Sequence, residues 1–259
     1  MTVYDVFMMN NEIDMIDIRL NILKDLVDVF IVMESKYTFS GREKPLYFET
    51  VMDKYTDIEF IYIVVDVPHK THTFDRKSRR QNLYAQRDSI VEYNDKTKIF
   101  KPNDIILIND IDEIPKPEYL KKLIDTGRQE KIRFKQKFYY FYLNYRCGND
   151  WTQGTVFIRG KDFTTFSKIR MDNTIEMIVD GGWHFSYMED PQDKIANLVE
   201  TEFDLEKFKT NKWLEEIKKT PKDIFNRNIE WYWETDVNDL PMYIKQNLNK
   251  YEKFIGVSE

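Results

Sequence analysis

The sequence of 259 residues contains a single cysteine, Cys147, and no apolar run near the roughly 20 residues that a membrane-spanning helix needs. A lone cysteine excludes an internal disulfide, so no oxidising compartment is implied. The chain has no Asn-x-Ser/Thr acceptor site, and its first residues lack the basic and apolar parts of a targeting peptide. These absences predict a cytoplasmic protein, and they leave peripheral contact with a membrane open.

An excess of positive charge is missing as well. The formal net charge of -6 argues against nucleic acid as the main partner, because binding to a phosphate backbone depends on concentrated Lys and Arg. Residues 76–80, Arg-Lys-Ser-Arg-Arg, are a local exception. They form either a solvated helix face or a binding place for a diphosphate or an anionic membrane surface.

Linkers rich in Gly or Ser and internal repeats are also absent, which predicts one domain over residues 1–259. Hydrophobic residues make up 42% of the chain and charged residues 32%, a composition typical of a folded globular protein. Aromatic residues, at 15%, suit a carbohydrate-facing surface, although a well-filled core is the commoner explanation.

The most informative segment is residues 105–115, Ile-Ile-Leu-Ile-Asn-Asp-Ile-Asp-Glu-Ile-Pro. Its apolar start predicts a strand buried on both faces of a parallel sheet. If the chain stays extended, Asp110 and Asp112 lie on the same side of it. Two carboxylates just past the carboxyl end of a parallel strand fit a divalent cation, although acidic residues there also act as turn formers and helix caps.

The residues before this segment predict alternating strands and helices. Strands are expected at residues 3–9, 29–33 and 58–65, with helices near residues 13–27 and 74–93. Asn11 and Glu34 each follow the end of a strand. Glu34 is placed to accept hydrogen bonds from a nucleotide. Asn10 and Asn11 are both candidates to cap the next helix, and for Asn11 contact with a ligand is the alternative.

After residue 115 the pattern changes. Pro117 is expected to begin a helix that Gly127 ends. Residues 132–145 read as strand, with residues 154–159 as an antiparallel partner, and residues 181–187 as a short strand. From residue 191 onward the chain is expected to be mostly helical, with a last helix from Pro241. The fold class is therefore α/β, with a mostly parallel central sheet flanked by helices, a small antiparallel portion and a helical C-terminal part.

Several segments, in this order, resemble glycosyltransferase family 17: residues 11–19, 27–35, 39–48, 86–88 (Gln-Arg-Asp), 109–115, 182–186 (Gly-Trp-His-Phe-Ser) and 241–254. The resemblance implies a GT-A-like domain, with residues 1–127 binding a nucleotide sugar and residues 128–259 facing the acceptor. It also implies metal-dependent, inverting transfer of a sugar, with UDP-GlcNAc as the expected donor, to a glycan or glycolipid hydroxyl in a β linkage. Mn²⁺ or Mg²⁺ is the expected cofactor. Animal members carry a membrane anchor that is not seen here, so a bacterial or viral polysaccharide or a lipid-linked acceptor is expected as readily as a protein-linked N-glycan.

The resemblance also implies roles for single residues. Asp110, Asp112 and His184 are expected to hold the metal, although His184 could also be a half-buried histidine bonded to backbone. Arg87 either pairs with a donor phosphate or braces Asp88. Trp183 either stacks on a sugar or packs in the core. With Asn11, Glu34 and Asp110, these two residues form the expected donor-binding set.

An inverting reaction needs a general base that takes a proton from the acceptor hydroxyl. Glu189 is the favoured candidate, and Asp190, Asp180 and Asp150 are alternatives. Glu113 is expected to contribute to catalysis by shaping the site rather than by touching metal.

Two other readings remain open. A metal-dependent nucleotidyltransferase or nucleotide-sugar phosphohydrolase would also use paired carboxylates, but it would attack phosphorus and release UMP instead of UDP. A non-catalytic glycan-binding module on the same fold would bind ligands without any turnover.

Overall fold

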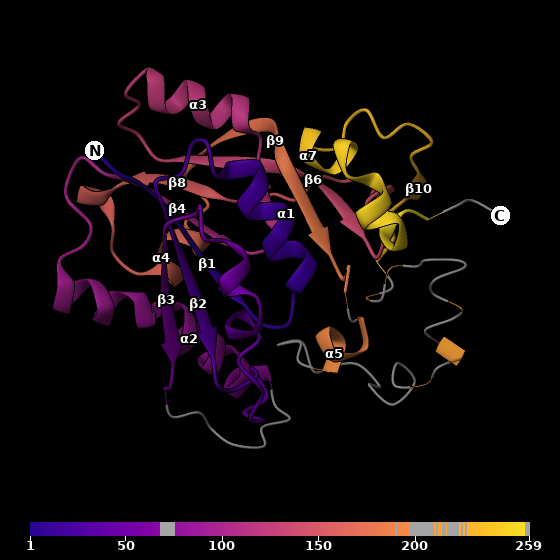
Figure 1. The fold of residues 1–259 in the computed structure, drawn as a ribbon, viewed down its shortest axis with the longest axis horizontal. Coiled ribbons are helices and arrows are strands. Elements are labelled where there is room, and N and C mark those ends of the chain that lie inside the picture. Colours follow the sequence, from indigo (N-terminus) through magenta and orange to yellow (C-terminus); the bar gives the residue numbers. More distant parts are fainter. Residues whose placement is uncertain are drawn as a thin grey trace.

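The computed structural model in Figure 1 describes residues 1–67, 76–189, 191–196 and 227–256, together with the single positions 210, 212, 213, 216, 223 and 225. Its strands are β1 (Val3–Met9), β2 (Val29–Ser35), β3 (Phe60–Val65), β4 (Ile105–Asp110), β5 (Glu113–Pro115), β6 (Ile132–Tyr140), β7 (Tyr145–Cys147), β8 (Val156–Arg159), β9 (Glu176–Ser186) and β10 (Trp231–Trp233). Its α-helices are α1 (Ile13–Leu23), α2 (Arg76–Thr97), α3 (Pro117–Asp125), α4 (Phe166–Met171), α5 (Pro191–Ala196) and α7 (Met242–Gln246). Short 3₁₀ helices cover η1 (Phe48–Thr50), η2 (Met52–Lys54), η3 (Gly160–Asp162) and η5 (Leu248–Phe254).

Four parallel strands form the centre of the sheet, as the sequence predicted, and their order is β3-β2-β1-β4. The chain adds β2 and β3 on one side of β1 and then β4 on the other, so the strand order reverses between β1 and β4. In open α/β sheets such a reversal leaves a crevice at the carboxyl ends of the strands. Asp110, the last residue of β4, pairs in register with Met8 near the end of β1 and therefore lies at this crevice.

Hydrophobic cores lie on both faces of this central part. In β4, Ile105 and Leu107 pack into one core and Ile106 and Ile108 into the other. Figure 1 shows α1 covering the first face, and α2 and α4 lie against the second. A strand buried on both faces needs consecutive apolar residues, which explains the uninterrupted apolar run at residues 105–108.

Beyond β4 the sheet continues through β8, β6, β7 and β10, and each of these strands runs antiparallel to the one before it in this order. The predicted antiparallel pairing is confirmed, with Ile132 of β6 opposite Phe157 of β8. The strand predicted at residues 181–187 begins earlier, at Glu176, and runs parallel to β6. Its first half is largely exposed although it contains Met177, Ile178 and Val179, and its strand pairing is with the distant β6.

The C-terminal part is less helical than predicted. Pro241 does precede α7, but that helix ends at Gln246 and is followed by the 3₁₀ segment η5. The short strand β10 pairs with β7 and was not predicted. Much of residues 197–226, expected to be helical, lies outside the described residues.

The chain is not extended past β4. Residues 111 and 112 form a turn, after which β5 pairs with β9. We call residues 110–113 the acidic turn. By contrast, Pro117 begins α3 as predicted, and Gly127, with φ of +62°, follows its end in the left-handed conformation that glycine tolerates.

The predicted cap of α1 is wrong. Neither Asn10 nor Asn11 caps this helix, whose N-cap position is Glu12 without a side-chain bond. The carboxylate of Glu189, distant in sequence, accepts the N–H groups of Asp14 and Met15 instead, at 2.5 and 2.9 Å. A carboxyl oxygen placed there satisfies free N–H groups at the N-terminus of the helix.

Candidate active site

A cavity of about 660 Å³ opens at the crevice between the ends of β1 and β4. Its walls come from the end of β1, the loop at residues 37–44, α2, the acidic turn, β6 and β9. Aromatic rings from both halves of the chain line it, among them Tyr84, Phe138 and Trp151. The volume is in the range of pockets that hold small molecules and cofactors.

Asp110 is in direct contact with two arginines that also line this cavity. Arg87, on α2, donates from Nη2 to both carboxylate oxygens, at 2.8 and 2.6 Å, and Arg170, on α4, approaches to 3.3 Å. Burial favours the neutral acid, but Arg170 and Arg87 outweigh it and hold the pKa of Asp110 below its usual range. Asp110 is therefore ionised at neutral pH, and both arginines line the cavity.

Asp112 faces a second pair of groups. Its Oδ2 lies 2.7 Å from Nζ of Lys194, on α5, and 3.4 Å from Nε2 of His184, on β9. Burial opposes ionisation, but Lys194 and then His184 lower the pKa of Asp112. Pairing of β5 with β9 brings His184 opposite Glu113, so the sheet itself places the imidazole beside the acidic turn.

His184 is fixed by aromatic neighbours as well as by the sheet. Its ring stacks on Phe138, with centroids 4.8 Å apart and an interplanar angle of 6°, and lies 4.6 Å from the ring of Trp151. Its Nδ1 is buried and has no hydrogen-bond partner among the described residues. These contacts do not favour the alternative in which His184 is held by hydrogen bonds to the backbone.

Glu113 lies at the bottom of the acidic turn and is almost fully buried, at 1% exposure. Both of its oxygens bond to Arg170, one of them at 2.7 Å; Oε1 also accepts the indole N–H of Trp151 at 2.8 Å, and Oε2 accepts the N–H of Asp110 at 3.1 Å. These bonds occupy the carboxylate fully. They favour a role in positioning Arg170 and Asp110 over contact with a substrate.

Arg19, on α1, donates hydrogen bonds to the backbone of the acidic turn. Its guanidinium forms a two-point ion pair with Asp5 of β1, with both N–O distances at 2.7 Å and both side chains fully buried. Nη1 donates to the carbonyl oxygens of Ile111 and Glu113, at 3.1 and 2.8 Å, and Nη2 bonds to Asn109. Charge-assisted bonds from a planar guanidinium give geometric precision, so this pair sets the direction of the turn.

A divalent cation fits part of the predicted set. Asp112 and His184 lie as close together as two ligands of one ion, whereas Asp110 is held by its arginines. Within the described ranges, no three His, Cys, Asp or Glu side chains converge as a closed metal site. Ions that bind nucleotides often take few protein ligands and complete their coordination with phosphate oxygens and water. Asp112 and His184 fit an open site of that kind.

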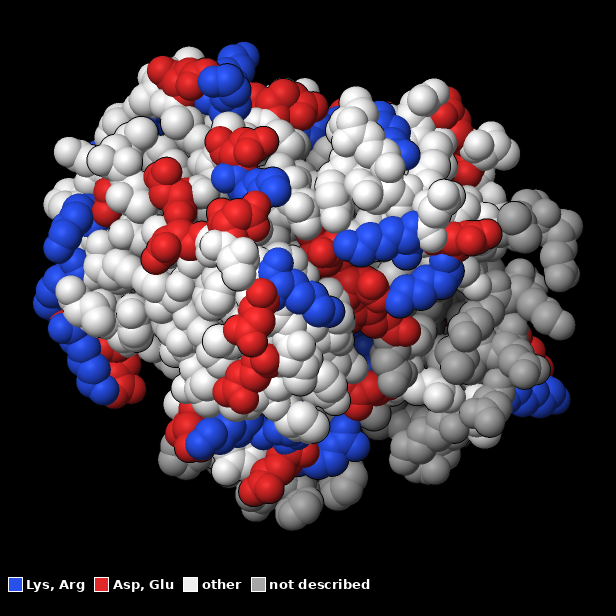
Figure 2. Space-filling view, in the orientation of Figure 1, with Lys and Arg blue, Asp and Glu red and all other residues white. Residues whose placement is uncertain are grey.

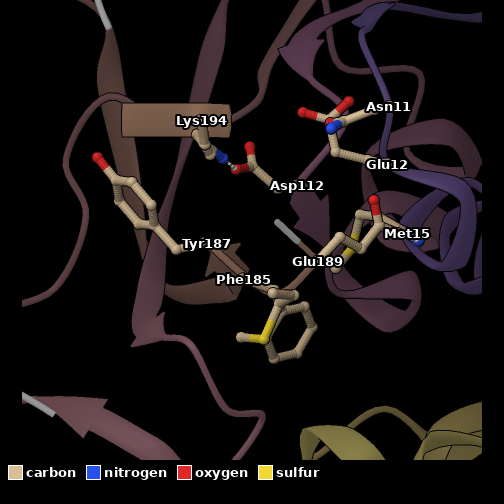
Figure 3. Close-up of a pocket in the computed structure, with 9 residues that line it drawn as sticks. Asn11, Glu12, Met15, Asp112, Phe185, Tyr187, Glu189 and Lys194 are labelled. Atoms are coloured by element: carbon tan, nitrogen blue, oxygen red, sulfur yellow. Dashed lines mark hydrogen bonds and ion pairs between the residues drawn. The ribbon is translucent and has the colours of Figure 1, made fainter. Parts of the chain in front are cut away.

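Glu189 lies in a smaller cavity next to the first, shown in Figure 3, together with Asn11, Glu12, Asp112 and Lys194. Burial, and then the neighbouring Glu12, raises the pKa of Glu189 to about 8. Its Oε2 is buried without a partner among the described residues. Asn11 donates from Nδ2 to Asp193 of α5, at 3.2 Å, and so joins the start of α1 to α5.

Two predicted donor-binding residues are engaged elsewhere. Glu34 is fully buried, and its oxygens accept from Lys44 and from the backbone N–H groups of Tyr47 and Phe48, at 2.7 to 3.0 Å. Trp183 packs in the core and donates from Nε1 to the carbonyl of Asp239, at 2.7 Å. Neither side chain lines the cavity. The contacts favour structural roles for both.

Of the basic cluster at residues 76–80, Arg79 is buried and Arg80 lines the cavity, so it is more than a solvated helix face. Figure 2 shows acidic and basic side chains interspersed over the described part of the face drawn. Among the described helices, each falls short of the length or apolar character that a bilayer crossing requires.

Sequence reasoning missed four residues of this site: Arg19, Arg170, Lys194 and Trp151. Arg19 fell within a segment that carried the family resemblance, but its partner Asp5 gave no signal. Arg170 and Lys194 lie in six-residue helices without a recognisable pattern. Only their distance in space to the acidic turn identifies them.

The fold and the cavity define an α/β protein. Its pocket is lined by ion pairs and lies where the order of the parallel strands reverses. The sequence model described as glycosyltransferase family 17 matches residues 1–208. The chain belongs to glycosyltransferase family 17, which confirms the resemblance seen in the sequence.

Curated relatives agree with that assignment. The chain is 31% identical over 111 residues to the β-1,4-mannosyl-glycoprotein 4-β-N-acetylglucosaminyltransferases of Homo sapiens and Rattus norvegicus. The match covers 41% of this chain and 20% of each relative. It therefore spans about a fifth of the length of those enzymes.

Solved structures show only a distant likeness. HddC from Yersinia pseudotuberculosis superposes with a TM-score of 0.41 at 11% identity, covering 70% of this chain and 92% of that one. A 4-diphosphocytidyl-2C-methyl-D-erythritol synthase gives a TM-score of 0.43 at 14% identity, covering 76% and 97%. Likeness at this level says nothing about activity.

Proposed function

We propose that this protein is a GT-A-like glycosyltransferase that moves a sugar from a nucleotide-sugar donor to a hydroxyl of a glycan acceptor. The observation that carries the proposal is the position of the acidic turn in a family 17 chain. The turn lies where the order of the parallel strands reverses, at a cavity large enough for a nucleotide sugar. Arg87, Arg170 and Lys194 supply positive charge around it.

The finer assignment is UDP-GlcNAc as donor, with inversion to a β linkage. It is supported by the names of the curated relatives, which are N-acetylglucosaminyltransferases. Rings such as Phe138 and Trp151 give the cavity apolar surface suited to the faces of sugar rings. The acceptor is a glycan or glycolipid.

For the metal, Asp112 and His184 are the residues that would hold Mn²⁺ or Mg²⁺. When bound, the ion would offset the charge that develops on the departing diphosphate. The protein's own residues act beside it. Arg87 and Arg170 are preorganised by Asp110 and Glu113, so they can pair with phosphate oxygens without first being ordered.

Glu189 is the proposed general base. A carboxylate with a pKa of about 8 is a much stronger base than an ordinary glutamate, and it becomes ionised, and so able to take a hydroxyl proton, as the pH rises toward and above 8. Its unpartnered Oε2 is the atom that would take the proton. Glu113 acts as a positioning residue through Arg170.

Product analysis tests the proposal. The protein is incubated with UDP-GlcNAc, Mn²⁺ and a panel of glycans, and products are separated by liquid chromatography with mass spectrometry. Release of UDP with an extended glycan supports it. UMP with sugar phosphate would instead indicate a nucleotidyltransferase or phosphohydrolase, and ligand binding without turnover would indicate a binding module. Asp112→Asn should lose transfer, whereas Glu176→Gln, a control at an exposed ion pair with Arg128, should keep it.

A further inference from the structure

Asp112 shares one oxygen between two groups. Oδ2 lies 2.7 Å from the ammonium of Lys194 and 3.4 Å from Nε2 of His184, and the side chain of Asp112 is only 7% exposed. Figure 3 shows the amine of Lys194 directed at this carboxylate. The ammonium also lies 5.2 Å from the centre of the Tyr187 ring. Lys194 therefore occupies the side of Asp112 that an ion held with His184 would need.

Each carboxylate of the acidic turn already has a cationic partner close to it. Three carboxylates, Asp110, Asp112 and Glu113, face three basic side chains, Arg87, Arg170 and Lys194. A divalent ion entering alone would leave an uncompensated double positive charge in a buried place, which is costly. An ion entering with a nucleotide diphosphate would bring its own counter-charge.

Lys194 can leave Asp112 without releasing α5. The preceding residue, Asp193, bonds to Asn11 at 3.2 Å and to Arg42 at 2.9 Å, so it fastens the helix independently. The side chain of Lys194 is 27% exposed and flexible, and it lines the large cavity as well as the small one. Its ammonium can therefore turn into the large cavity.

We propose that Lys194 is a displaceable counter-ion of Asp112: a divalent cation replaces its ammonium, and the released ammonium then binds the phosphates of the nucleotide. This inference rests on the proposed function, since it takes the ligand to be a nucleotide diphosphate. It makes Lys194 a competitor of the metal and a partner of the diphosphate. A side chain that merely supported the fold would affect both ligands in the same direction.

Two binding measurements separate these roles. Mn²⁺ binding without nucleotide is followed by the electron paramagnetic resonance signal of the free ion, for the wild type, Lys194→Met and Lys116→Met. Lys116 is the matched control, because its ion pair with Asp180, at 2.5 Å, lies outside the cavity. Lys194→Met should bind Mn²⁺ about tenfold more tightly than the wild type, and the control should be unchanged.

The second measurement is titration calorimetry with UDP at saturating Mn²⁺, where Lys194→Met should bind about tenfold more weakly. Lys194→Arg, which keeps the charge, should stay near the wild type in both assays. Lys194→Gln, which loses the charge but keeps a polar side chain, should repeat both changes and covers the case in which Lys194→Met fails to fold. Unchanged or weaker Mn²⁺ binding by Lys194→Met, or no Mn²⁺ binding by any variant, overturns the inference. Failure of the proposed function appears differently: both binding responses would be present, but no sugar would be transferred.

Discussion

Replacing Glu189 by Gln should remove a pH dependence from the stability of this protein. The carboxylate caps α1 through Oε1, while Oε2 is buried with no partner among the described residues. Burial and the neighbouring Glu12 raise its pKa from 4.5 to about 8. Glutamine keeps an oxygen that can accept the N–H groups of Asp14 and Met15, but it cannot ionise.

The sign of this pH dependence follows from which state, folded or unfolded, binds the proton of Glu189 more tightly. Below pH 4.5 both folded and unfolded chains keep the proton on Glu189. Between pH 4.5 and about 8 only the folded chain keeps it, so the free energy of unfolding falls as the pH rises, and it levels off above that range. At ~1.4 kcal/mol per pKa unit the full effect is at most ~5 kcal/mol. Part of the pKa shift comes from the coupled carboxyl of Glu12. We therefore expect Glu189 to change the free energy of unfolding by ~2 to 3 kcal/mol, which corresponds to roughly 5 to 10 °C in melting temperature.

Thermal unfolding followed by circular dichroism at pH 5, 7 and 9 measures this. The wild type should lose several degrees more than Glu189→Gln between pH 5 and 9, and Glu176→Gln, at an exposed ion pair, should follow the wild type. Parallel curves for the wild type and Glu189→Gln would refute the reasoning, because they would mean that Glu189 ionises as easily in the folded chain as in the unfolded one.

Three further outcomes are expected. Arg19→Met should lower the free energy of unfolding by ~3 to 5 kcal/mol, because it leaves Asp5 buried without its partner; denaturation in urea measures this, and a loss below 1 kcal/mol would contradict it. Gly182→Ala should cost ~1 to 3 kcal/mol by the same assay, since a Cβ there would collide with the carbonyl of Ile114 across β5 and β9; an unchanged midpoint would count against that packing. Asp112→Asn should abolish the extra thermal stabilisation that UDP-GlcNAc gives in the presence of Mn²⁺, and equal shifts in both proteins would argue against Asp112 as the ion's ligand.

The sequence predicted the parts of this protein that depend on local pattern. Apolar runs such as residues 105–108 identify strands buried on both faces, and Pro117 and Gly127 mark the ends of α3. The acidic residues Asp110 and Asp112 were found in the same way, because they follow such a run.

What could not be predicted depends on contacts between distant segments. The turn at residues 111–112 arises because β5 pairs with β9, and the cap of α1 comes from Glu189, more than a hundred residues away. The cations Arg170 and Lys194 likewise reach the acidic turn only after folding. Glu34 lies near the carboxyl end of its strand, which continues to Ser35, and its hydrogen bonds are made inside the protein rather than with a ligand.

The ion pair between Arg19 and Asp5 has a consequence for how this protein can vary. Because it ties the buried strand β1 to the acidic turn, which is proposed to meet the substrate, folding and the proposed chemistry depend on the same residues at this point. Substitutions at Arg19 or Asp5 would lower the amount of folded protein before they changed which substrate is used. New specificities are therefore expected to arise at exposed residues of the cavity wall remote from this pair, such as Met171 at the end of α4, which can change without disturbing the core.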